Sequence, residues 1–91
     1  MTHAEWSRAL AIVRHVLREP GALSERSVAL LRVSVLPQIE AAIAMLGEGQ
    51  EPETVLRWNA FLPAAVAAVG PDPALNRVEH HLRSGLMALR P

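Results

Sequence analysis

The chain has 91 residues, of which 51% are hydrophobic and 3% aromatic, with a formal net charge of zero and no cysteine. This length allows one domain, residues 1–91, whose modest core is built mainly from Leu, Val, Ile and Ala. The balanced charge argues against electrostatically driven binding to nucleic acid or anionic membranes, and the lack of cysteine excludes disulfides, thiol catalysis and thiolate metal sites.

The first segment, from about His3 to Glu19, has the periodicity of an amphipathic helix. Charged residues interrupt every apolar run near its start, so we expect no secretory signal and a cytoplasmic protein. The arginines on its polar side are flanked by acidic residues, which favours a solvated face over a nucleic-acid site. All nine basic residues of the chain are Arg, a bias typical of high-GC bacterial genomes. The predicted inward face consists of Trp6, Ala9, Leu10, Val13, Val16 and Leu17.

The second segment runs to Gly47, with Ser24 as its predicted N-cap. It is apolar on nearly every side, which is unusual for a helix of so short a chain. Arg32 and Glu40 lie in its interior and are costly in hydrocarbon, so we expect no membrane span. Pro37 predicts a kink or a break. The predicted core stripe consists of Val28, Leu31, Val35, Ile39, Ala42, Ile43 and Leu46.

A polar, acidic loop over residues 47–52 precedes a third helix, about Glu53 to Val69, in which Pro63 predicts a second disturbance. Residues 31–37 and 56–63 have similar sequences, which leaves open a duplication or a coincidence. The predicted inward stripe consists of Val55, Trp58, Leu62, Ala65, Val66 and Val69.

Asp72 and Pro73 are typical of an N-cap and a first helical residue, and they begin the last helix. Arg90 near its end complements the helix dipole. No segment sustains a period of two, so the sequence predicts an all-α fold: a small antiparallel bundle of about four helices, the second and third kinked or broken at their prolines. The inward residues of the last helix are Leu75, Val78, Leu82, Leu86 and Leu89.

The residues carry no convincing catalytic, cofactor or metal signature. Glu79, His80 and His81 are adjacent and therefore point about 100° apart on a helix, whereas helical metal ligands lie three or four residues apart. The run from His80 to Gly85 is similar to the phosphorylation motif of histidine phosphotransfer domains. That resemblance implies, as an alternative function, phosphotransfer through His80 with Arg83 as the nearby basic residue.

The second and third helices offer more apolar surface than a four-helix monomer covers, and such surplus usually marks an interface. We therefore expect a non-enzymatic helical interaction protein that self-associates or docks on a larger protein as an accessory subunit. Homo-oligomer and hetero-complex stay open. The predicted contact residues are Leu30, Val33, Leu36, Ala41, Leu56, Ala60, Phe61 and Met87.

An alternative of a different class is a helical bundle that binds a hydrophobic small molecule. In that hypothesis the two proline disturbances open a pocket between the second and third helices. The predicted lining residues are Trp58, Phe61, Leu36 and Ile39.

Overall fold

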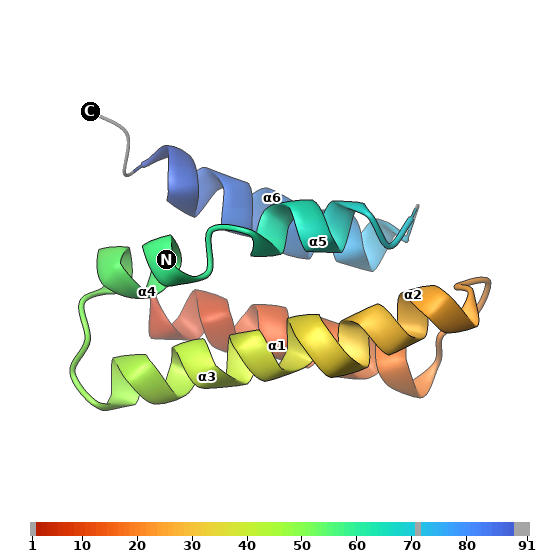
Figure 1. Ribbon diagram of the computed structural model, residues 1–91, viewed down its shortest axis with the longest axis horizontal. Coiled ribbons are helices and arrows are strands. Elements are labelled where there is room, and N and C mark those ends of the chain that lie inside the picture. Colours follow the sequence, from red (N-terminus) through yellow and green to blue (C-terminus); the bar gives the residue numbers. More distant parts are fainter. Residues whose placement is uncertain (1, 71, 89–91) are drawn as a thin grey trace.

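The computed structural model describes residues 2–70 and 72–88, and over this part of the chain it contains helices and no strand (Figure 1). The predicted all-α class is therefore confirmed. In chain order the elements are α1 (His3–Arg18), α2 (Glu25–Leu30), the π-helical turn η1 (Leu31–Val35), α3 (Leu36–Gly47), α4 (Pro52–Trp58), α5 (Leu62–Ala67) and α6 (Pro73–Met87).

The helices form two layers (Figure 1). In one layer α1 packs against the oppositely directed run of α2, η1 and α3, and in the other α5 packs against α6. Extensive contact between α1 and α6 joins the layers, while the short α4 connects α3 to α5. The core between them is a single cluster to which all these elements except α2 contribute buried residues.

The first helix follows its predicted pattern closely. Thr2 caps it, since its hydroxyl accepts from the Glu5 amide at 3.3 Å. Its inward face lies in the core, with Leu10 and Leu17 packed at the margin. The fully or almost fully buried residues are Trp6, Ala9, Val13 and Val16.

The second predicted segment is one continuous helix, Glu25–Gly47, called here the long helix. Ser24 caps it as predicted, because its Oγ accepts from the Ser27 amide at 3.1 Å. The disturbance expected at Pro37 takes the form of the π-helical turn, in which the Leu36 amide donates to the Leu31 carbonyl five residues back. This wide turn ends just before the proline, which has no amide to donate. The helix thereby continues past Pro37.

The third predicted helix is divided, as Pro63 indicated. A turn over residues 59–61 separates α4 from α5. Asn59 in this turn is fully buried, and its Nδ2 donates to the Val55 carbonyl at 3.1 Å. The two similar sequence runs therefore have different structures, since residues 31–37 stay within one helix whereas residues 56–63 span a break.

The turn also changes which residues of the third segment face inward. Trp58, expected in the core stripe, is 50% exposed. Leu56, expected away from it, is buried instead, and so is Asn59. The predicted stripe kept one helical phase from Val55 to Val69, whereas the turn separates α4 from α5 and lets the two helices bury faces of different phase. Val55, Leu62, Val66 and Val69 are buried as predicted.

Asp72 caps α6 as predicted, and its Oδ1 accepts from the Ala74 amide at 2.8 Å. Leu75, Val78 and Leu82 are buried, and Leu86 packs against the core. The expectations for Leu89 and Arg90 fall outside the described residues.

Candidate interaction surface

The long helix combines an apolar sequence with an exposed position. An 18-residue window within it has a mean hydropathy of 1.6, yet only 22% of the residues in that window are fully buried, and the others are half-buried or exposed. Its inward residues Leu31, Val35 and Ile39 are fully buried, so the exposure belongs to its other sides. We call the row of exposed apolar residues on the outer side the outer ridge, which consists of Ala29, Val33, Pro37 and Ala44.

Val33 is the most exposed large apolar side chain among the described residues, at 75%. It belongs to the π-helical turn, where Leu31 and Val35 are both fully buried. The turn therefore places one valine in the core and another in water, two positions apart. An exposed valine alone is ordinary, but here it lies in a row of exposed apolar side chains.

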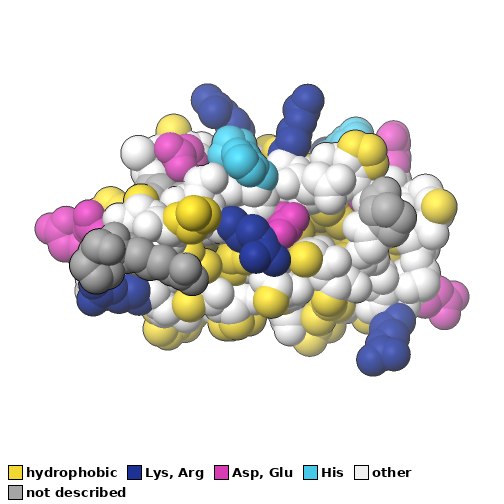
Figure 2. Space-filling view, turned by 90° about the horizontal axis from the view of Figure 1, so that it is seen from above, with side chains coloured by type: hydrophobic (Ala, Val, Ile, Leu, Met, Phe, Trp, Pro, Cys, Tyr) yellow, Lys and Arg dark blue, Asp and Glu magenta, His cyan; other side chains and the backbone are white. Residues whose placement is uncertain are grey.

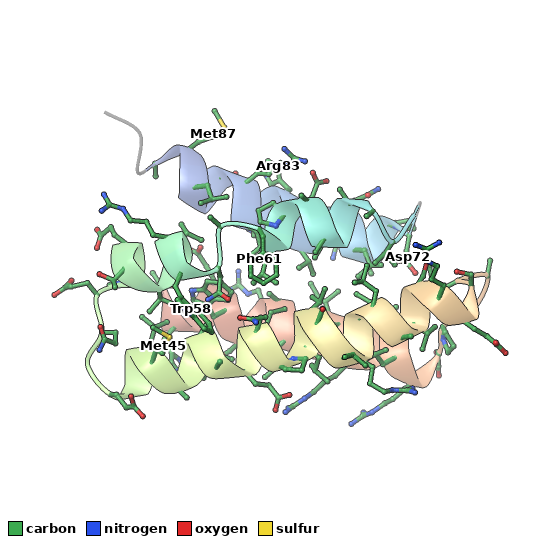
Figure 3. The ribbon with its side chains drawn as sticks, viewed as in Figure 1. Met45, Trp58, Phe61, Asp72, Arg83 and Met87 are labelled. Atoms are coloured by element: carbon green, nitrogen blue, oxygen red, sulfur yellow. The ribbon has the colours of Figure 1, made fainter. Side chains whose placement is uncertain are left out.

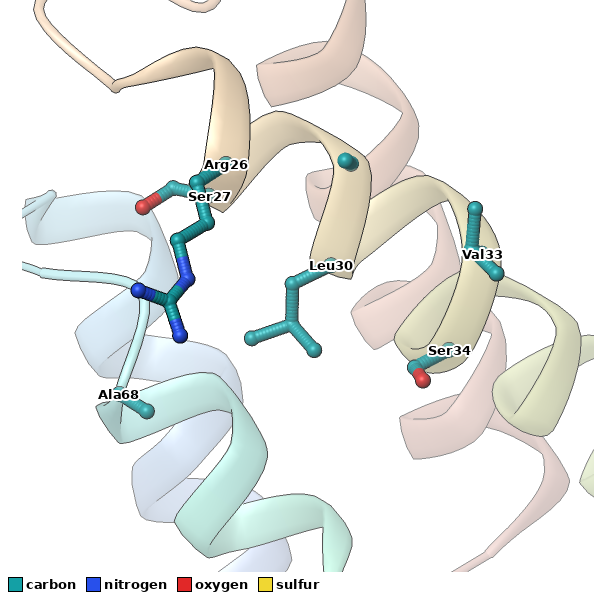
Figure 4. A pocket seen from close by; sticks show the side chains of 7 residues that line it. Arg26, Ser27, Leu30, Val33, Ser34 and Ala68 are labelled. Carbon is teal, nitrogen blue, oxygen red and sulfur yellow. The ribbon is translucent and has the colours of Figure 1, made fainter.

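A groove adjoins the outer ridge, between α2 with η1 on one side and the end of α5 on the other (Figure 4). Its volume is about 620 Å³, and Leu30 and Ala68 supply apolar surface from its opposite walls. The Ser27 Oγ donates to the Val69 carbonyl at 2.9 Å, which ties the two walls together at one end. The complete lining is Arg26, Ser27, Ala29, Leu30, Val33, Ser34 and Ala68.

Hydrophobic side chains gather along one long edge of the molecule when it is seen from above, whereas histidine and several arginine side chains project along the opposite edge (Figure 2). The apolar edge corresponds to the side of α5, which lies in front of α6 in Figure 1. In this view the apolar side chains therefore lie mainly along one edge, from which arginine side chains also project.

The predicted contact residues lie in separate regions of the surface, some on the long helix and others near α5 and α6. On the long helix, Val33 and the half-buried Leu30 border the groove, and Leu36 and Ala41 are partly buried. Ala60 and Met87 line a second hollow, between α5 and α6, and Met87 is 66% exposed. The structure does not bring these two groups into one patch.

Phe61 and Trp58 flank the break between α4 and α5. Both project toward the layer of α1 and α3 (Figure 3), and Phe61 is 48% exposed. The prediction that Leu56 is a surface contact residue is wrong. Leu56 is only 1% exposed, because it lies on the inward face of α4.

Sequence reasoning missed the contribution of small and polar residues to the groove. Ala68 and Ser34 line it, but neither belongs to the apolar stripe that drew attention to this region. Their signal is only the Ala-rich composition after Pro63 and the one-turn spacing of Leu30 and Ser34. Ala68 and Ser34 lie in the same groove because α5 packs beside η1.

Exposed charges on the long helix are divided along its length. Arg26 and Arg32 lie in the first half, Glu40 lies in the second half, and Glu48 follows directly. Glu40 pairs with Arg14 of α1 at 3.5 Å, with both side chains about half exposed. Such an exposed pair contributes little to stability, so it leaves the Glu40 carboxylate available to other cations.

None of the four residues predicted to line a small-molecule pocket lines the groove described above. Ile39 is fully buried, while Trp58 and Phe61 are about half exposed at the break. The hollow described above lies elsewhere, beside Leu30 and Ala68. A pocket lined by the four predicted residues stays a prediction, distinct from the groove between the long helix and α5.

His80 is exposed on α6. Arg83 lies one turn later, and its Nε donates to the Glu79 carboxylate. The rings of His80 and His81 lie edge to face, with their centroids 6.0 Å apart. Within the described residues no three His, Asp or Glu side chains group in a way that could hold a metal ion. Phosphotransfer through His80 stays a prediction.

Among the described helices, the long helix alone is long and apolar enough to cross a membrane. Core helices of soluble proteins and signal sequences meet the same criteria of length and composition. Comparison with known proteins gives no assignment, since no family model, curated protein or solved structure matches the chain.

Proposed function

We propose that this chain is a non-enzymatic helical interaction protein, and that the outer ridge and the adjoining groove form the surface to which a protein partner binds. The partner surface belongs either to a second copy or to a larger protein for which the chain is an accessory subunit. The observation that carries the proposal is the long helix, which is hydrophobic enough for a protein interior although only 22% of the residues in its most apolar window are fully buried.

Burying this surface stabilises a complex through the hydrophobic effect. At about 25 cal/mol per Å², an apolar face of a few hundred Å² contributes several kcal/mol before association entropy offsets part of it. The groove strengthens the case because it is concave and bordered by Val33, so a partner side chain gains contacts on more than one side.

A protein partner is favoured over insertion of the long helix into a membrane. Leu31, Val35 and Ile39 are fully buried against the rest of the chain, and insertion would remove them from the core. The helix also carries the exposed charges Arg32 and Glu40, which are costly in hydrocarbon. A cytoplasmic location is part of the same proposal.

The test combines light scattering with binding of an apolar dye, for the wild type and for Val33→Glu. The wild type is expected either to exceed 9.9 kDa in a concentration-dependent way or to bind the dye as a monomer. Val33→Glu, which places a charge on the ridge without touching the core, is expected to reduce both signals while circular dichroism stays unchanged. A wild-type monomer that binds no dye contradicts the proposal.

A hydrophobic small molecule in the groove is the second candidate. Its support is the volume of about 620 Å³, which falls within the range of roughly 300–1,000 Å³ typical of ligand sites. Trp58 does not line this groove, so the measurement is the change in NMR shift of the Leu30 and Ala68 methyl groups on addition of a hydrophobic ligand. Shifts confined to these methyls favour the ligand, and unchanged shifts exclude it.

A further inference from the structure

We propose that the occupant of the outer ridge is a second copy of this chain, whose long helix packs antiparallel to the first across a two-fold axis near Leu36 and Pro37. This inference rests on the proposed function and specifies its partner. The arrangement is isologous, so the same residues of both copies form the interface and the assembly closes as a dimer.

The distribution of charge along the long helix selects the direction. Arg26 and Arg32 lie before the proposed axis, and Glu40 and Glu48 lie after it. Antiparallel packing therefore places the basic half of one helix against the acidic half of the other, whereas parallel packing places like charges together. Glu25 is the exception, and it lies at the helix start, where a carboxylate is stabilised by the helix dipole. Opposed helix dipoles favour the same direction.

The position of the axis follows from the exposed residues. Placing it near Leu36 and Pro37 brings Arg32 close to Glu40 of the second copy, and symmetry makes this pair twice. Glu40 pairs with Arg14 through Oε2, at 3.5 Å, so Oε1 remains to accept from the incoming Arg32. Among the described residues Arg32 has no carboxylate within 4.0 Å in its own chain.

The same axis sets Ala29 of one helix opposite Ala44 of the other. Both residues are exposed, and their small side chains let the two backbones approach closely. Residues 29 and 44 are fifteen positions apart, or about 22 Å along a helix. In a symmetric parallel pair, Ala29 would instead lie opposite Ala29 of the second copy, Ala44 would lie opposite Ala44, and Ala29 would lie far from Ala44.

Engineered cysteines distinguish these geometries, because the natural chain has none. Ala29→Cys and Ala44→Cys are prepared separately, one with a size tag, then mixed and oxidised under native conditions. A disulfide requires Cα atoms within about 7 Å, so the proposal predicts a mixed dimer and little self-linking of either variant. Ala11→Cys, exposed on α1, is the control for random collision. Self-linking of each variant, or linking no greater than the control, overturns the proposal.

Charge exchange provides a second test without cysteine. Arg32→Glu and Glu40→Arg each create two like-charge contacts across the axis, so each alone is expected to raise the dimer Kd about tenfold. An equimolar mixture restores both opposite-charge contacts and is expected to recover dimerisation. Arg14→Gln removes the Arg14–Glu40 pair but leaves Arg32 and Glu40 in place, so it controls for the loss of that pair. A mixture as weak as its components overturns the antiparallel pairing.

The failures are distinguishable. A wild type that stays monomeric by sedimentation at micromolar concentrations overturns the self-pairing. If that monomer still binds an apolar dye, and Val33→Glu reduces the binding, the proposed interaction surface stands with another protein as partner. If the dye does not bind, the proposed function falls as well.

Discussion

Two valines of the π-helical turn provide a matched test of which side of the long helix is covered by its own fold. Val35 is fully buried and Val33 is 75% exposed, although they are the same residue type in the same turn. Val35→Ala removes two buried carbons, at about 0.8 kcal/mol each, and leaves a cavity, so it is expected to cost about 2–3 kcal/mol. Val33→Ala is expected to stay within about 0.5 kcal/mol of the wild type, because it leaves no cavity and alanine favours a helix.

The measurement is thermal unfolding at a protein concentration low enough to keep the chain monomeric. For a domain of this size, about 1 kcal/mol shifts Tm by roughly 4–8 °C. Val35→Ala is therefore expected to lower Tm by about 10–20 °C, whereas Val33→Ala leaves it nearly unchanged. Equal losses in the two variants would refute the reasoning, because they would show that the monomer buries Val33 as it buries Val35.

Three further substitutions test local features by the same unfolding measurement. Asp72→Ala removes the N-cap of α6 and is expected to cost about 1 kcal/mol, whereas Asp72→Asn keeps an accepting oxygen and costs less; equal losses would contradict the cap. Ser27→Ala removes the hydrogen bond to Val69 at the groove and is expected to cost about 1 kcal/mol, and an unchanged stability would show that this bond does not hold the walls together. His80→Ala removes an exposed side chain and is expected to change stability by less than about 0.5 kcal/mol; a larger loss would place His80 in the packing of α6.

Local signals in the sequence were sufficient for most of the fold. The caps at Ser24 and Asp72 are short-range features, since a side-chain oxygen reaches an amide only two or three residues away. The apolar stripes of α1 and of the long helix also depend only on helix periodicity. Such features are readable without knowledge of the tertiary structure.

The third segment was harder to predict because a proline signals a disturbance without specifying its form. Before Pro37 the chain widens into a π-helical turn and continues, whereas before Pro63 it leaves the helix altogether. Only the second outcome frees α4 to pack with a rotation different from that of α5, and in that rotation Leu56 faces inward and Trp58 outward. The choice depends on packing around the turn, including burial of Asn59, and this is a tertiary property.

The candidate surface was predicted in part. Val33 and Leu30 followed from the apolar perimeter of the long helix, and both border the groove. Ala68 could not be assigned to the same site because it lies far away in sequence and is brought there by the packing of α5 beside η1. Periodicity identifies which side of a helix is apolar, but it does not specify which neighbour stands beside that side.

The fold of this chain leaves the outer ridge of the long helix uncovered, and the solvent accessibility of Val33 and Val35 in dilute solution tests this arrangement. A soluble paramagnetic agent added to methyl-labelled protein measures this through NMR relaxation. We predict strong relaxation of the Val33 methyl groups and little effect on those of Val35. Equal protection of the two residues in the monomer would show that the fold covers Val33 as it covers Val35.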